Sequence, residues 1–402
     1  MERLYSILEI MKIKDIVRFH SETTTPIPGV VYHLYSLPSF DNNQTREELL
    51  GQDIQSNKFT VPNRCILFNK LNVRFKRIWR IDSDEDHKIS STEFLPLIID
   101  ENKVDFDYCF YLLASPAITD YLCGQNANTS GSHKRIDPTN FFNIGIKLPP
   151  LAQQYEIGKL LSSLDTKIKL NRAINQNLEA MAKQLYDYWF VQFDFPNEEG
   201  KPYKSSGGTM VWNEKLKRFI PKGWESTTLG NECHMYQPKT LGLSELDEAA
   251  KYKVYGANGV IGKYHTYNHE NSEIAMACRG NSCGTVNITA PFSWITGNAM
   301  VIKMIDGSIH NEYIKQALQY ANVDGAISGS GQPQLTRENL NSIKLCKPTR
   351  ELIIRFSEQV SNIVEMYLQN ESNIEELTKQ RDELLPLLMN GQVSVNSDLS
   401  AH

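Results

Sequence analysis

The chain has few cysteines and no long apolar run. Its seven cysteines lie singly among 402 residues and form no Cys-x-x-Cys pair, the nearest two being Cys278 and Cys283. This pattern argues against a disulfide-rich secreted scaffold and against a structural zinc site. No segment reaches 18 successive apolar residues, and the N-terminus MERLYSILEIMKIKD lacks the apolar stretch of a secretion signal. The sequence therefore predicts a cytoplasmic protein with reduced thiols and no contact with a membrane.

Motifs for nucleotide or metal chemistry are also missing. There is no Gly-x-x-x-x-Gly-Lys-Ser/Thr phosphate loop, no Asn/Asp-Pro-Pro-Tyr/Phe methyltransferase tetrapeptide and no His-Glu-x-x-His zinc motif. The glycines of Gly256–Gly262 have the spacing GxxGxxG, which is not the dinucleotide spacing GxGxxG, so we interpret this segment as a turn. His265 and His269 are interpreted as loop histidines, and the acidic run 82–86 as a solvated turn. We therefore expect no catalytic residue, no metal and no cofactor in this chain.

Charge is distributed unevenly along the sequence. The net charge is −5, which alone argues against a nonspecific nucleic-acid binder. Between residues 350 and 383 there are eight acidic and four basic residues, a balance of −4 that accounts for most of the net charge. Residues 64–80 contain six basic residues and no acidic one. The globular parts therefore carry local basic patches that can face DNA phosphates, while the acidic excess lies in residues 350–383.

One long amphipathic segment organises the chain. Residues 150–195 contain a single glycine and no proline after the first position. The segment has a seam with 4-3 spacing, formed by Ile157, Leu161, Leu164, Ile168, Asn171, Asn175, Leu178, Ala182, Leu185 and Trp189, of which eight are apolar. This spacing is typical of a coiled-coil helix, and a helix of that length would be roughly 60 Å long. Because such a helix exceeds the core of one domain, it needs a partner.

The same seam recurs 199 residues later. Its positions are Phe356, Val360, Ile363, Tyr367, Asn370, Ile374, Leu377, Arg381, Leu384 and Leu388, again with eight apolar residues. A similar lead-in precedes each helix, Thr129-Ser-Gly-Ser132 with Ile136 in the first copy and Ile327-Ser-Gly-Ser330 with Leu335 in the second. The chain is therefore interpreted as a tandem duplication of a globular module followed by a long helix. The alternative is that each helix covers only its own module.

The predicted fold class is mixed α/β (α+β). Two globular modules of strands and helices are each followed by a long helix, and the two helices pack as an antiparallel coiled coil with pseudo-two-fold symmetry. The predicted parts are module 1 (1–149), the first long helix (150–195), a connector (196–226), module 2 (227–348), the second long helix (349–390) and a flexible tail (391–402). Within them we expect a strand at 141–148, a helix at 311–320 and a kink or stop of the second helix at Pro386.

After these exclusions, the remaining candidate residues are polar side chains that can recognise DNA. Arg and Lys can donate to guanine O6 and N7, Asn and Gln can pair with adenine N6 and N7, and the cations can neutralise phosphates. The candidate DNA contacts in module 1 are Lys70, Arg74, Lys76, Arg77, His133, Lys134 and Arg135. Those in module 2 are Tyr255, Asn258, Lys263, Arg279, Asn298, Ser330, Gln332, Gln334 and Arg337. Any one of them alone is a common surface residue; their occurrence in two duplicated modules favours a reader of two half-sites.

Three asparagines interrupt the two seams: Asn171, Asn175 and Asn370. A buried Asn in a coiled coil fixes the register of its helices at some cost in stability. If the helices cross antiparallel at their midpoints, Asn175 lies opposite Asn370. We therefore predict that this pair sets the register, with the alternative that these side chains lie at the edge of the seam in water.

Several short motifs resemble the specificity (S) subunits of type I restriction–modification systems. They are Leu148-Pro-Pro-Leu-Ala-Gln-Gln154, Leu164-Asp165, Asn177–Ala182, Tyr188-Trp-Phe190, Phe193-Asp194, Gly207-Gly208 with Gly223-Trp224, Tyr255-Gly256 with Asn258-Gly259 and Gly262, Gly280–Thr285, Gly297-Asn298, and Leu384–Gln392. Together they cover nearly the whole chain. The second lead-in departs from the pattern, with Cys346-Lys347-Pro348 where the first has Pro149-Pro150-Leu151.

The resemblance implies a non-catalytic subunit with two target recognition domains, each reading one half of a bipartite double-stranded DNA sequence. It implies that methyltransferase (M) subunits dock on the helices and carry S-adenosylmethionine, and that restriction (R) subunits supply the chemistry that needs ATP and Mg²⁺. Two alternatives stay open. A single-chain DNA-modifying enzyme should bind S-adenosylmethionine or cut DNA by itself, and a coiled-coil scaffold without DNA readout should show no sequence-dependent binding even beside its M partner.

Overall fold

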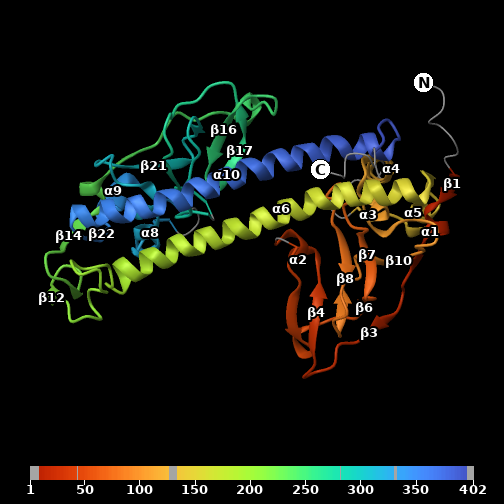
Figure 1. Ribbon diagram of the computed structural model, residues 1–402, viewed down its shortest axis with the longest axis horizontal. Coiled ribbons are helices and arrows are strands. Elements are labelled where there is room, and N and C mark those ends of the chain that lie inside the picture. Colours follow the sequence, from red (N-terminus) through yellow and green to blue (C-terminus); the bar gives the residue numbers. More distant parts are fainter. Residues whose placement is uncertain (1–8, 43, 126–133, 281, 330–332, 396–402) are drawn as a thin grey trace. The chain divides into compact units, whose positions relative to one another are not determined.

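The structure is a computed structural model that describes residues 9–42, 44–125, 134–280, 282–329 and 333–395. Two compact units make up the chain (Figure 1). Unit 1 consists of Met1–Leu170 with Ile374–His402, and unit 2 of Asn171–Asn373. Each unit thus contains one globular module and a stretch of both long helices. The predicted limits of the modules and connector themselves stay predictions.

Module 1 lies in unit 1 and is built of short strands with a few helices. Its strands are β1 (Glu9–Lys12), β2 (Val17–Phe19), β3 (Thr23–Thr24), β4 (Val31–Tyr35), β5 (Glu47–Leu50), β6 (Lys58–Thr60), β7 (Arg64–Asn69), β8 (Ile78–Asp82), β9 (Lys88–Ser90), β10 (Phe94–Ile99) and β11 (Gly145–Leu148). Its helices are α1 (Ile13–Ile16), α2 (Leu37–Asp41), η1 (Gly51–Asp53), α3 (Phe106–Ala114), α4 (Pro116–Gln125) and α5 (Pro138–Phe142). The long helix α6 (Leu151–Tyr186) follows and ends in a π-helical turn, η2 (Asp187–Val191).

Module 2 and its flanking hairpin lie in unit 2. The strands are β12 (Met210–Asn213), β13 (Arg218–Pro221), β14 (Glu225–Thr228), β15 (Cys233–Tyr236), β16 (Tyr252–Gly256), β17 (Gly259–Tyr264), β18 (Ile274–Ala277), β19 (Val286–Ile288), β20 (Trp294–Ile295), β21 (Ala299–Met304) and β22 (Lys344–Lys347). The helices are α7 (Leu229–Glu232), η3 (Leu243–Glu245), α8 (Asn311–Tyr320), η4 (Asp324–Ala326) and α9 (Arg337–Asn341), followed by the long helix α10 (Arg350–Met389).

The two modules share their strand order except for β3 and β6, which extend the second sheet of module 1 beyond β9. A four-stranded sheet β2-β10-β7-β8 in module 1 corresponds to β15-β21-β18-β19 in module 2. The strands β5-β4-β9 correspond to β17-β16-β20, with β4 parallel to β9 and β16 parallel to β20. An outer antiparallel pair, β1 with β11 or β14 with β22, joins the start of each module to its end. The predicted duplication and the mixed strand and helix class are therefore confirmed.

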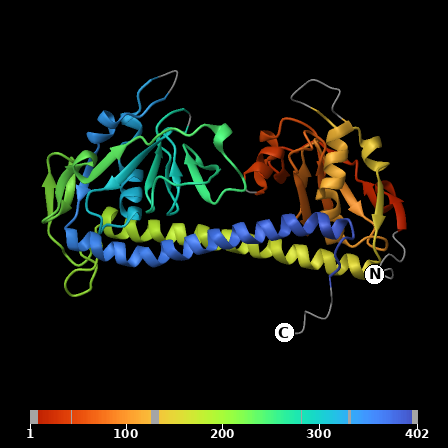
Figure 2. The same cartoon turned by 90° about the horizontal axis from the view of Figure 1, so that it is seen from above.

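In unit 1, the start of α6 lies beside the end of α10 (Figures 1 and 2). Ile157 and Leu161 from α6 share one buried cluster with Leu385 and Leu388 from α10 and with the sheet and α3 of module 1. Asp165 joins the two helices through its carboxylate, which accepts a hydrogen bond from Arg381 at 2.8 Å and another from the Tyr111 hydroxyl at 2.5 Å. The helices are thus antiparallel here, and both are attached to module 1.

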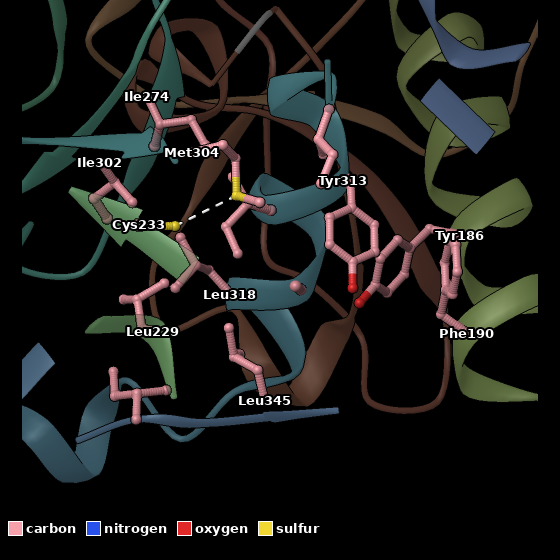
Figure 3. Packing of buried hydrophobic residues seen from close by; sticks show 14 of the residues in the cluster. Tyr186, Phe190, Leu229, Cys233, Ile274, Ile302, Met304, Tyr313, Leu318 and Leu345 are labelled. Atoms are coloured by element: carbon pink, nitrogen blue, oxygen red, sulfur yellow. Dashed lines mark hydrogen bonds between the residues drawn. The ribbon is translucent and has the colours of Figure 1, made fainter. Parts of the chain in front are cut away.

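In unit 2, the end of α6 lies beside the start of α10. Tyr186, Trp189 and Phe190 surround the fully buried ring of Phe356, with ring centroids between 5.1 and 6.0 Å apart. Figure 3 shows Tyr186 and Phe190 facing Tyr313 of α8, so that the helix end joins the core of module 2. The remaining core comes from β15, β18 and β21, where Cys233 lies 3.4 Å from the Met304 sulfur.

The predicted seams form the buried faces of both helices. In α6, eight of the ten positions are buried and the other two, Asn171 and Leu185, are partly buried. In α10, four positions are buried and six partly buried, so no seam position is exposed in either helix. The 4-3 spacing therefore identified the correct face because the partner helix and the module cover a single stripe.

Asn175 lies on the seam as predicted, but its predicted partner is wrong. Its side chain is 4% exposed, and its amide donates to the Glu371 carboxylate at 2.8 Å and to the Tyr367 carbonyl at 3.4 Å. Asn370, which is one residue away in the sequence, is turned about 100° around the helix from Glu371. The residue predicted from the helix midpoints to face Asn175 was therefore one position off. The Glu371 carboxylate accepts from the buried amide nitrogen, while Asn175 Oδ1 has no hydrogen-bond partner among the described residues.

Two local predictions are also corrected. The strand expected at 141–148 begins only at Gly145, because Pro138–Phe142 form α5 with Asp137 as its N-cap. Helix α10 does not stop at Pro386 but continues to Met389, so the predicted stop is wrong and the alternative of a kink there stays a prediction. Burial of Leu385 and Leu388 in the core of unit 1 offsets the hydrogen bond that the proline removes. Among the described residues, no helix is long and apolar enough to cross a membrane.

Candidate nucleic-acid interface

A loop of module 1 and the segment before α5 together carry six of the predicted DNA contacts. Strands β7 and β8 form an antiparallel pair whose connection spans residues 70–77. The backbone of this loop is bonded to the segment before α5, since the Asn72 amide donates to the Lys134 carbonyl at 2.8 Å and the Ile136 amide to the Lys70 carbonyl at 2.9 Å. Lys70, Arg74, Lys76, Arg77, Lys134 and Arg135 therefore share one surface. His133 lies outside the described residues.

Two of these arginines form bidentate ion pairs. Arg77 donates from Nε and Nη2 to the two carboxylate oxygens of Asp41, both at 2.7 Å. Arg135 donates from Nε to Glu93 Oε2 at 2.9 Å and from Nη2 to Oε1 at 2.5 Å. The hydrogen bonds from these guanidinium groups lower the pKa of both carboxyls from their ordinary values. Asp41 and Glu93 were not among the predicted residues, because they come from distant segments.

An exposed aromatic ring also lies in this loop and was missed. Phe75 is 47% exposed, with the guanidinium carbons of Arg74 and Arg77 at 4.6 and 5.0 Å from its ring centroid. Such contacts keep the arginines over the ring face and limit their freedom. The stretch Arg74-Phe-Lys-Arg77 carries the signal, since an aromatic residue between cations is a common feature of nucleic-acid surfaces.

We predict an acid-dependent contribution from the Glu93–Arg135 pair. Because the folded pKa of Glu93 is lowered, the pair stabilises the module above the unfolded carboxyl pKa and loses this contribution as pH falls through the folded value. Glu93→Gln should lower the melting temperature between about pH 6 and pH 8, and this difference should shrink toward about pH 3. Thermal melts of both proteins across this range measure the difference. A difference that grows in acid would contradict the assignment.

In module 2 the corresponding surface is an open depression. A cavity of about 520 Å³ is lined by Ala257, Arg279, Gly280, Asn298, Pro333 and Gln334. Three predicted contacts, Arg279, Asn298 and Gln334, thus come together, and all three are exposed. Asn258 adjoins the cavity in the turn between β16 and β17. None of the lining residues is acidic, so the depression offers one cation and two amides to a negatively charged or hydrogen-bonding ligand.

The two surfaces are built on the same backbone frame. The Lys70 amide donates to the Glu93 carbonyl at 2.9 Å, and the Cys278 amide is bonded in the same way to the Asn298 carbonyl at 3.5 Å. The Ile136 amide donates to Lys70, as the Leu335 amide does to Cys278 at 3.0 Å. Isolated bridges pair Leu71 with Arg135 and Arg279 with Gln334. Glu93 is therefore equivalent to Asn298, and Arg135 to Gln334.

The other predicted contacts of module 2 are placed differently. Tyr255 was predicted to contact DNA, and this prediction is wrong. Its ring is buried in the core, and its hydroxyl accepts a hydrogen bond from the Ala290 amide at 2.9 Å. Lys263 lies away from the cavity, paired with Lys253 along the β16–β17 hairpin. Arg337 is exposed at the start of α9. Ser330 and Gln332 lie outside the described residues. Among residues that the structure describes, no cluster of three His, Cys, Asp or Glu side chains could hold a metal ion.

Comparison with known sequences decides the family. The sequence pattern of the type I restriction modification DNA specificity domain matches residues 8–180 and 221–376, one match for each module and most of its helix. The chain belongs to this family. The sequence-based prediction of a type I specificity subunit is thus confirmed, and the basic loop of module 1 and the cavity of module 2 are features of its two DNA specificity domains.

Similar proteins agree with this assignment. The chain is 24% identical to the type I restriction enzyme HindI specificity subunit of Haemophilus influenzae, over 82% of this chain and 86% of that protein. It is also 24% identical to the MjaIX specificity subunit of Methanocaldococcus jannaschii, over 74% and 71% of the two chains. The fold is similar to the crystal structure of the type I S subunit from M. genitalium, with a TM-score of 0.61, 16% identity and coverage of 96% and 97%.

Proposed function

We propose that this chain is the non-catalytic subunit that gives a type I restriction–modification complex its sequence specificity. Module 1 reads one half of a bipartite double-stranded DNA target and module 2 the other half. The single observation that carries this proposal is the repeated backbone frame, which presents a different set of polar side chains at the same positions of two family-matched domains. Different side chains on one frame suit two different half-sites.

The proposal assigns the chemistry to partner chains. Methyltransferase subunits dock beside the long helices and bind S-adenosylmethionine, while restriction subunits join through the complex and use ATP and Mg²⁺. Support comes from the sequence, which has no phosphate-loop or methyltransferase motif. Because its DNA substrate and partners meet in the cytoplasm, we propose that the chain acts there.

Methylation mapping tests the proposal. The chain is produced together with its methyltransferase partner, and modified adenines are located in plasmid DNA that was exposed to the complex. We expect methylation at a two-part sequence with a fixed gap, and none without this chain. Methylation or cleavage of DNA by the chain alone would favour the single-chain enzyme, and a complex without any sequence preference would favour the scaffold.

Exposed cations of the basic loop should act on affinity and leave the sequence preference intact. Lys76 is exposed, and we predict that it contacts a phosphate. Lys76→Ala should weaken binding of the complex to all sequences alike and reduce the slope of log affinity against log salt by about 1. Fluorescence anisotropy at several salt concentrations measures the slope, with Lys217→Ala, whose cation pairs with Glu214, as the control. Altered sequence preference with an unchanged slope would contradict this role.

Asn175 should determine which gap lengths between the two half-sites the complex accepts. We propose that the α6–α10 register sets this gap and that the bond between Asn175 and Glu371 fixes the register in unit 2. Replacing both Asn175 and Asn370 with Leu should leave the two half-site sequences unchanged and broaden the accepted gap lengths. Asn370→Leu alone is the matched control, because Asn175 bonds Glu371 instead. An unchanged gap preference in the double variant would argue against a register role.

A further inference from the structure

Two pairs of side chains occupy equivalent places in the two modules. Glu93 and Arg135 of module 1 stand where module 2 has Asn298 and Gln334, as the shared backbone hydrogen bonds and bridges establish. In both modules one member precedes a central strand, β10 or β21, and the other precedes a short helix, α5 or α9. The frame is constant while the chemistry of the pair changes.

The pair in module 1 presents one guanidinium edge to solvent. Glu93 occupies Nε and one hydrogen of Nη2, and no other described residue takes the Nη1 hydrogens or the second Nη2 hydrogen of Arg135. The Arg135 side chain is 60% exposed, whereas Glu93 is only 19% exposed beneath it. Two parallel donors on a fixed fork match the O6 and N7 acceptors of guanine. The carboxylate reduces the rotamer freedom that binding would otherwise remove.

The pair in module 2 presents two amides. Asn298 and Gln334 are exposed and line the 520 Å³ depression together with Arg279. Each amide carries both a donor and an acceptor, which is the combination required to pair with N7 and the N6 amino group of adenine. Arg279 stands where module 1 has Leu71, so this cation is an addition to the pair and has no counterpart in module 1.

We infer that these are equivalent base-reading positions, at which Arg135, held by Glu93, reads a guanine in one half-site and the Asn298–Gln334 pair reads an adenine in the other. The inference rests on the proposed function, because it names the bases that the two specificity domains select. Arg77 has a different role. Its side chain is 17% exposed and tied to Asp41, so it positions the loop and reads no base.

The experiment exchanges the two pairs of side chains between the equivalent backbone positions of the two modules. The complex of this chain with its methyltransferase subunit is mapped for methylated adenines in four forms: the natural chain, Arg135→Lys, Glu93→Asn with Arg135→Gln, and the reciprocal Asn298→Glu with Gln334→Arg. Arg77→Lys is the matched control, because it alters in the same way another arginine of module 1 that is held by a carboxylate. Thermal melts of each variant show that the chain is folded.

We expect Arg135→Lys to relax one guanine position in one half-site by roughly 5- to 150-fold, because lysine keeps the charge and loses the fork. The Glu93→Asn, Arg135→Gln form should shift that position toward adenine, and the reciprocal form should shift one position of the other half-site from adenine toward guanine. Arg77→Lys should leave every position unchanged.

Three results would overturn the inference and leave the proposed function intact: a natural two-part motif that Arg135→Lys leaves unchanged, a change confined to the overall methylation rate, or equal relaxation by Arg77→Lys. A natural chain that directs no two-part motif at all would instead refute the proposed function. If an exchanged form does not fold, Arg135→Lys and Gln334→Glu, which alters only a side chain of the depression, decide each module separately.

Discussion

Phe356→Ala is expected to destabilise unit 2 by about 3 to 5 kcal/mol, which is the usual cost of removing a fully buried phenylalanine. Phe356 is completely buried. The rings of Tyr186 at the end of α6, of Trp189 and Phe190 in η2 and of Tyr313 in α8 surround it. The substitution leaves a cavity at the point where both long helices meet module 2. Urea denaturation followed by tryptophan fluorescence measures the loss, since Trp189 reports on this site.

Phe219→Ala is the control for that measurement. Phe219 is 57% exposed on the β12–β13 hairpin, where it contacts Trp212. Its removal should change stability by less than about 1 kcal/mol, as is usual for exposed side chains. Equal losses from the two substitutions would show that the aromatic cluster contributes little to the joining of the helices with module 2.

Gly158→Ala is expected to destabilise unit 1, although alanine usually favours a helix by about 1 kcal/mol. Gly158 lies in α6 under the N-terminus of α3. A Cβ atom there would lie 2.7 Å from Asp105 Oδ1 and 2.8 Å from the Tyr108 amide nitrogen, which are the two partners of the α3 N-cap bond. The expected loss is about 1 to 3 kcal/mol from overpacking, together with about 1 kcal/mol from the disturbed cap.

The matched control is Gly124→Ala in α4. A Cβ atom at Gly124 has no heavy atom within 4 Å, so the substitution should be neutral or stabilising by up to about 1 kcal/mol. The melting temperature should therefore fall for Gly158→Ala and stay level or rise for Gly124→Ala. A stabilised Gly158→Ala chain would mean that α6 and α3 do not approach this closely.

In module 2, the equivalent close approach between α10 and α8 involves a serine instead of a glycine. Ser357 occupies the place of Gly158 in α10, and its hydroxyl accepts a hydrogen bond at 3.0 Å from the amide of His310, the N-cap of α8. A small residue at this point is thus required in both helices, but only the second copy uses it for a hydrogen bond.

The periodic parts of the structure could be predicted from the sequence. The 4-3 seam gave the buried faces of α6 and α10 because burial along a helix depends on spacing alone, and the tandem repeat gave two modules of one topology. Helix α8 has the predicted bounds Asn311–Tyr320. The strand expected at 141–148 does not begin at Phe141, because the Asp137 N-cap and Pro138 favour a helical turn there.

For the candidate site, the sequence predicted the types of residues involved but not their partners in the fold. Sequence reasoning selected Arg77, Arg135 and Arg279 by residue type, but it could not separate them. Whether a guanidinium is held by a carboxylate depends on Asp41 and Glu93, which lie 36 and 42 residues away from their arginines and arrive through sheet topology. Tyr255 was misplaced for the same reason, since its strand buries it in the sheet core.

The participation of Leu385 and Leu388 in the core of unit 1 has a consequence for biosynthesis. Domains generally acquire their structure as they leave the ribosome, from the N-terminus onward. Here module 1 is translated well before α10, yet its apolar interior is completed only when α10 has emerged. Until then Ile157 and Leu161 lack these partners, so the core of unit 1 should stay incompletely packed until α10 has been synthesised.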